Sequence, residues 1–151
     1  MIDGADIVFF SVRITEEISK WLPRGSGASQ QEQQINEAEG LAALTLIVTC
    51  KDRLRGAALS IYIDNTGAQG ALVKGFSGSK FLTAIAAEFW DVAIRHDIAI
   101  WIGRVASDDN IADPPSRDDC SFLEGHLGAR RLHPVFTNPD KYWYLRKPDR
   151  K

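Results

Sequence analysis

The stretch ALSIYIDNTGAQGALVKGFSGS, residues 58–79, decides the fold. Its first part, ALSIYID (58–64), is a continuous apolar run that ends in a carboxylate. Such a run predicts a β-strand that is buried on both faces, as in the middle of an α/β sheet. Residues 66–73 are typical of a short helix, and GFSGS (75–79) is typical of a turn. A buried strand followed directly by a helix indicates an α/β domain.

Longer elements are expected on both sides of this stretch. Residues 34–49 carry apolar side chains nearly all round a helix, so we expect that helix to be covered on two sides. Residues 80–95 have the spacing of an amphipathic helix. The remaining predicted elements are a strand at 6–14, a helical turn at 16–22 after Thr15, a loop at 23–34, a strand at 98–106, and a helix from Ser107 that Pro114 and Pro115 end. The order β, α, β, α, α, β, α predicts an α/β domain with a mixed sheet.

Composition excludes several classes of protein. The length of 151 residues fits one domain, and 18 basic against 20 acidic residues give a formal charge of −2, which does not indicate a strongly basic nucleic-acid binder. No apolar run approaches the roughly 18–20 residues of a membrane span, and the first ten residues lack the pattern of a secretory signal. We therefore expect no membrane partner. Cys50 and Cys120 fit neither a disulfide framework nor a zinc site, so we expect a reducing compartment and an intracellular protein, cytoplasmic or nuclear.

Three acidic residues stand in positions that favour metal chemistry. Glu39 shares a helical face with apolar residues, Asp64 ends the buried strand, and Asp113 follows the next strand. Carboxylates gathered in one place repel each other unless a cation lies between them, and oxygen ligands suit Mg²⁺ or Mn²⁺. A pair of such ions activates water and stabilises the leaving oxygen of a phosphodiester. The acids therefore predict metal-dependent phosphoryl transfer.

Each of these residues also has a purely structural interpretation. Glu39 could lie at a helix edge, and periodicity does not choose between it and its neighbour Glu37. Asp64 and Asn65 could form a turn or cap the next helix, and Asp113 could be an ordinary loop carboxylate. The three acids taken together, in this order, are more specific than any one of them.

Three separated motifs resemble the ribonuclease H domain of retrotransposons and other reverse-transcribing elements. INEAEGLAAL (35–44) is similar to the first-helix motif of that family, and its register selects Glu39 over Glu37. IYIDNTGAQGALVKGFSGS (61–79) resembles the segment that carries the second Asp, here Asp64. WIGRVASDDNIADPPSR (101–117) resembles the terminal motif and places the last acid at Asp113, although Asn110 stands three residues before it where the family often has four.

The resemblance implies a function and a site. It implies a three-layer ribonuclease H-like fold and a metal-dependent endonuclease that cuts the RNA strand of an RNA–DNA hybrid. Two Mg²⁺ or Mn²⁺ ions would be held by Glu39, Asp64 and Asp113, which would be both the metal ligands and the catalytic residues. The expected nucleic-acid contacts are Asn65, Arg104, Asn110 and Arg117.

The resemblance covers residues 1–117 and leaves 118–151 as a C-terminal extension. The family carries a further acid on an opening central strand, and we expect that strand to be missing here, because Asp3 stands too close to the next strand. The strand at 58–64 would then have a free edge unless residues 6–14 dock there or another chain supplies the pairing, and a free edge favours self-association. Two alternatives stay open: an inactive retroelement remnant, and a module of the same fold that binds nucleic acid or protein.

Overall fold

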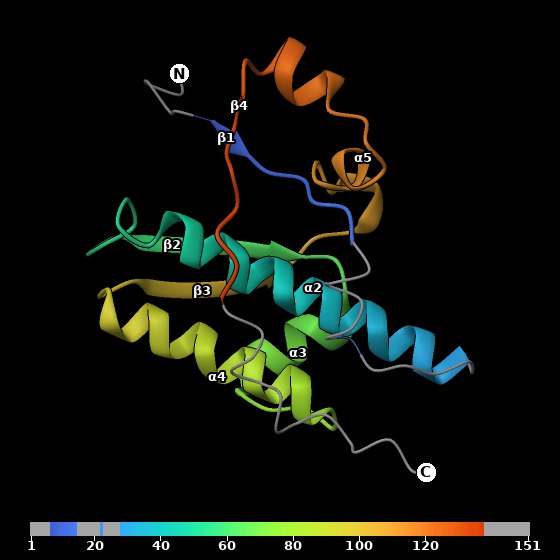
Figure 1. The fold of residues 1–151 in the computed structure, drawn as a ribbon, viewed down its shortest axis with the longest axis vertical. Helices are drawn as coiled ribbons and strands as arrows, with labels where there is room; N and C mark the ends of the chain where they lie inside the picture. The colour runs from blue at the N-terminus through green and yellow to red at the C-terminus, as the bar shows by residue number, and fades with distance from the viewer. Residues whose placement is uncertain (1–6, 15–21, 23–27, 138–151) are drawn as a thin grey trace.

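The computed structural model describes residues 7–14, 22 and 28–137. In this part of the chain the structure is mixed α/β (Figure 1). The strands are β1 (Val8–Phe9), β2 (Ala58–Ile63), β3 (Ala99–Arg104) and β4 (Arg130–Arg131). The helices are α2 (Ala28–Cys50), α3 (Thr66–Lys74), α4 (Lys80–Arg95) and the short α5 (Asp113–Ser116). A 3₁₀ turn at Ser107–Asp109 and a π-helical turn at Phe122–His126 complete the elements of this part of the chain.

The described strands form two separate parallel pairs. β2 pairs with β3 from Ala58↔Ala99 to Ile63↔Arg104, and β1 pairs with β4 through Val8↔Arg130 and Phe9↔Arg131. Within the described residues no antiparallel pair occurs, so the expected mixed sheet is not observed there. The β2–β3 connection contains α3 and α4, and a helical crossover of this kind returns the chain parallel to its starting strand.

The expected strand at 6–14 is much shorter in the structure. Of its described residues only Val8 and Phe9 are in a strand, and their partners come from residues 130–131 in the expected extension. The strand predicted at 98–106 is confirmed at 99–104. The helical turn expected at 16–22 lies outside the described residues, apart from Leu22.

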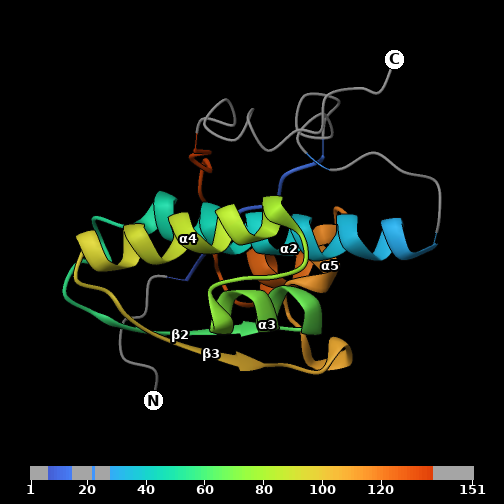
Figure 2. The ribbon, with the colours of Figure 1, turned by 90° about the horizontal axis from the view of Figure 1, so that it is seen from below.

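β2 is buried on one face only, which corrects the expectation of burial on both. Ile61 and Ile63 are buried, whereas alternate residues of the strand are exposed on the other face. On that face Tyr62 packs edge-to-face against Trp101 of β3, with ring centroids 5.6 Å apart. Because helices lie only on the inner side of the β2–β3 pair (Figure 2), the outer face stays open in the described chain.

The core lies between this sheet and the helices. Its largest fully buried side chains include Leu44 and Ile47 of α2, Leu72 of α3, and Ile85 and Phe89 of α4. Figure 2 shows α2 and α4 side by side, with α3 between them and the strands. One side of α2 therefore packs against other helices, while residues 8–14 lie over another side.

Two helix starts differ from the sequence-based expectation. α2 begins at Ala28 inside the predicted loop, because the Gln- and Glu-rich stretch before residue 35 consists of good helix formers. The predicted helix from Ser107 is only a 3₁₀ turn of three residues. Pro114 and Pro115 do not end a helix but occupy the first turn of α5, where a missing N–H costs no helical hydrogen bond.

Candidate functional site

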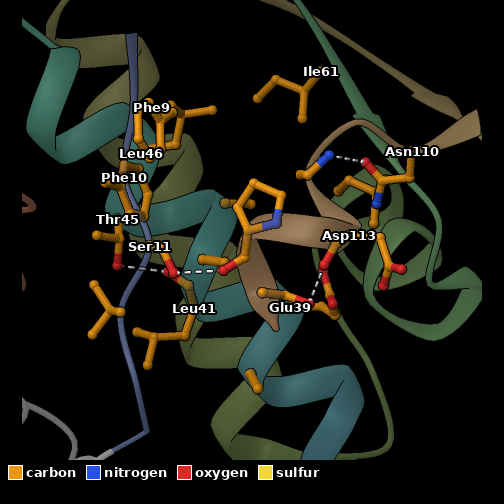
Figure 3. A pocket seen from close by; sticks show the side chains of 18 of the residues that line it. Phe9, Phe10, Ser11, Glu39, Leu41, Thr45, Leu46, Ile61, Asn110 and Asp113 are labelled. Atoms are coloured by element: carbon orange, nitrogen blue, oxygen red, sulfur yellow. Dashed lines mark hydrogen bonds between the residues drawn. The ribbon is translucent and has the colours of Figure 1, made fainter. Parts of the chain in front are cut away.

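A cavity of about 790 Å³ lies against α2 on the side away from α4 (Figure 3). Residues 8–14 form one wall, Ile61–Asp64 form another, and the segment around α5 closes one end. Most of its lining is apolar, including Phe9, Leu41 and Leu46. Such a volume and lining are within the range of ligand-binding clefts.

The three predicted acids line this one cavity from three different elements. Glu39 comes from α2, Asp64 follows the last residue of β2, and Asp113 is the first residue of α5. In Figure 3 Glu39 and Asp113 lie near each other, and Asn110 lines the same cavity. Acids that are 25 and 49 residues apart in the sequence thus share the carboxyl end of β2, because the strand and the two flanking helices meet there.

Local packing explains why Asp64 is held at this place. The side chain of Asn65 caps α3 by accepting a hydrogen bond from the backbone N–H of Ala68 (2.8 Å). Gly67 in the first turn lies so close to α2 that a Cβ would be 2.4 Å from the amide nitrogen of Asn36. A larger residue at position 67 would require the Asn36 side chain to move, so glycine lets the turn from β2 into α3 lie close to α2.

Burial and negative charge act together on the carboxyl of Glu39. The pKa of Glu39 is raised, first by burial and then by the negative charges of Asp64 and Asp113. Asp113 has one positive neighbour, because Arg117 forms an ion pair with it at 3.1 Å on the exposed side. Burial and these two charges disfavour the ionised Glu39 carboxyl, which forms no ion pair within residues 7–14, 22 and 28–137.

The three carboxylates are suitable ligands for a hard divalent cation, although their side chains do not surround a common point. Among the described residues no group of three His, Cys, Asp or Glu side chains has the geometry of a metal site. Carboxylate oxygens are nevertheless the ligands that Mg²⁺ and Mn²⁺ prefer.

The four residues expected to contact nucleic acid differ in their exposure and in the partners of their side chains. The side-chain oxygen of Asn65 is engaged in capping α3, and that of Asn110 accepts a hydrogen bond from the N–H of Ala112 (3.1 Å) while its residue lines the cavity. Arg117 is exposed and tied to Asp113. Arg104 is exposed at the end of β3, where its Cα is paired with that of Ile63 next to Asp64. All four lie at or near the acidic end of the cavity.

Glu37 takes the opposite side of α2 and a different role. It is fully buried, and its Oε1 accepts hydrogen bonds from the hydroxyl of Ser79 and from Gln33 Nε2. Burial raises its pKa. Sequence periodicity left Glu37 and Glu39 equivalent. The structure separates them, because Glu37 contacts Ser79, the N-cap of α4, whereas Glu39 lines the cavity. The serine immediately before the helix at 80–95 was the signal for that cap.

Comparison of the chain with known protein families, with curated protein sequences and with solved structures gave no match. The resemblance to ribonuclease H therefore stays a prediction that rests on three sequence motifs. None of the described helices is both long and apolar enough to cross a bilayer.

Proposed function

We propose that this chain is a ribonuclease H-like domain that binds Mg²⁺ or Mn²⁺ and cleaves the RNA strand of an RNA–DNA hybrid. One observation carries the proposal: the three acids of separate motifs line a single cavity at the carboxyl end of β2.

Each side chain has a role in this proposal. Glu39, Asp64 and Asp113 would hold the cation, which when bound supplies Lewis acidity and offsets the charge of the scissile phosphate. Arg117, already next to Asp113, and Arg104 would contact backbone phosphates on the approach to the site. Asn110 has its amide oxygen fixed by Ala112, so its NH₂ group stays available as a donor to substrate.

The raised pKa of Glu39 gives the proposal a pH dependence. A metal ligand must be deprotonated, and burial together with two neighbouring carboxylates makes the Glu39 carboxyl hold its proton more tightly. Metal affinity is therefore expected to rise with pH through the folded-state pKa of Glu39.

A cleavage assay tests the proposal. A labelled RNA–DNA hybrid is incubated with the full chain in Mg²⁺, in Mn²⁺ and in EDTA. We expect divalent-dependent cleavage that Asp64→Asn abolishes and that Asp52→Asn leaves unchanged, since Asp52 is an exposed acid after α2, outside the cavity lining. Absence of cleavage in either metal at all protein concentrations would refute the nuclease.

One observation favours a second candidate function, a non-catalytic nucleic-acid-binding module. The described acids are not gathered into a three-ligand metal group, and Asp113 is engaged by Arg117. Such a module would bind the hybrid without cutting it, and its affinity would fall with salt and with loss of Arg104 or Arg117 but not with EDTA.

A further inference from the structure

One edge of β2 is unpaired among the described residues and borders the cavity, and the hydrogen bonds to β3 show which backbone groups point to that edge. Ala99 N–H donates to Ala57 O (2.9 Å), and Val105 N–H donates to Ile63 O (3.2 Å). With the parallel register, these bonds place the N–H and C=O groups of the odd-numbered residues on the β3 side. The even-numbered residues Ala58, Ser60 and Tyr62 therefore direct their backbone groups to the opposite edge.

The cavity lies along that opposite edge. Ile61 to Asp64 line it, whereas no residue of β3 does. In the described part of the chain, no other strand pairs with this edge of β2. A row of backbone donors and acceptors thus borders an apolar cavity, which is the arrangement that accepts an added strand.

The opposite wall is also extended chain. Backbone pairing of β1 with β4 ends where Leu132 N–H donates to Phe9 O (2.7 Å), and residues 10–14 continue along the cavity without a backbone partner among the described residues. Val12 and Ile14 of this wall are exposed. Figure 3 shows the wall with Phe9, Phe10 and Ser11 running over α2.

The floor suits alternating apolar side chains. Ala38, Ala42 and Leu46 follow each other at four-residue spacing on α2 and line the cavity, and Ala42 is exposed in mid-helix. Small side chains on the floor leave room for larger ones that point down from a strand above them.

We propose that this cavity binds an extended peptide segment of another polypeptide, which adds to the free edge of β2 and places apolar side chains at alternate positions over α2. A peptide fits better than a compact apolar ligand, because the walls offer unused backbone donors and acceptors as well as apolar surface. The proposal is independent of nuclease activity, since it uses the edge of β2 and not the three acids.

Peptide binding is tested with a defined probe and a matched pair of variants. The probe is a fluorescein-labelled, end-capped peptide Lys-Val-Thr-Val-Thr-Val-Lys, and its control has the same composition with the valines adjacent. Tyr62→Pro removes one N–H on the cavity edge, while Tyr62→Val removes the same aromatic ring and keeps that N–H. We expect anisotropy to show binding of the alternating peptide, which weakens about two- to tenfold further in the proline than in the valine variant.

A second pair of variants tests the floor. Ala42→Gln fills the cavity from α2, and Ala87→Gln makes the same change at an exposed alanine of α4 outside the cavity lining. We expect Ala42→Gln to abolish binding and Ala87→Gln to leave it unchanged. Equal affinity for both peptides, or equal affinity of the proline and valine variants, would overturn the proposal.

Amide hydrogen exchange supplies a readout that does not depend on any variant. In the free chain the Tyr62 amide should exchange fast while those of Ile61 and Ile63 are protected by β3, and the peptide should slow Tyr62 alone among the three. A Tyr62 amide already protected in dilute protein would mean that the chain covers its own edge. Protection that grows with protein concentration alone would mean that a second copy does. Either result would refute the proposed partner.

Discussion

Substitution of Ser79 by alanine should destabilise the fold through two contacts that share one hydroxyl. Ser79 Oγ accepts the N–H of Leu82 (3.2 Å) as the N-cap of α4, and it donates to the carboxylate of the fully buried Glu37. Loss of an N-cap costs about 1 kcal/mol. A buried acceptor left with one donor fewer costs about 1–3 kcal/mol more. The expected loss in unfolding free energy is therefore about 2–4 kcal/mol, a large part of the roughly 5–15 kcal/mol of a typical domain.

Urea unfolding followed by circular dichroism measures this loss. Ser79→Thr keeps the hydroxyl and should stay within about 1 kcal/mol of the parent. In a double-mutant cycle with Glu37→Ala, the two residues should show a coupling of about 0.5–3 kcal/mol. A loss of 1 kcal/mol or less for Ser79→Ala, together with additive effects in the cycle, would show that only the cap matters and that Glu37 is not held by Ser79.

Three further substitutions probe the site and the core. Glu39→Gln in EDTA should be neutral or stabilising at pH 7, because a raised pKa in the folded state means that the ionised carboxylate opposes folding. This destabilisation is absent below pH 4.5 and grows as the pH rises through the folded-state pKa, so melting temperatures measured over a pH series check its sign. Asp64→Asn should remove the rise in melting temperature that Mg²⁺ causes in the parent, where Mg²⁺ at ten times its dissociation constant stabilises the fold by about 1.4 kcal/mol. A rise that is unchanged in a thermal-shift titration of the variant would place the cation elsewhere. Phe89→Ala, at a fully buried position, should cost about 3–5 kcal/mol in urea unfolding, and a loss below 1 kcal/mol would contradict the assigned core.

The elements with strong local signals were predicted well from sequence. The amphipathic helix at 80–95 is confirmed with the same bounds, because its apolar spacing and its cap Ser79 are both local. The strand at 58–64 and the helix after it are confirmed to within one residue, because Asn65 caps the helix and Gly75, at φ 75°, ends it. The structural role of the two prolines at 113–116 was harder to predict, since proline is compatible with both the end and the first turn of a helix.

Glu37 and Glu39 show where sequence reasoning ends. Both lie on α2 among apolar neighbours, and helical periodicity assigns neither of them a role. Packing separates them. One side of α2 meets the start of α4, so Glu37 is buried against Ser79. The other side lies under residues 8–14, where Glu39 lines the cavity together with Asp64 and Asp113.

By itself, the sequence determined the local elements around residues 58–95, because caps, turns and apolar spacing act over a few residues. Only the tertiary structure decided how the strands pair and what the acids face. The short β1 pairs with β4 at residues 130–131, so that in the described part of the chain one edge of β2 has no partner strand beside the cavity. Pairing between strands that are distant in sequence depends on which surfaces remain accessible after the helices pack, and a local sequence pattern does not contain that information.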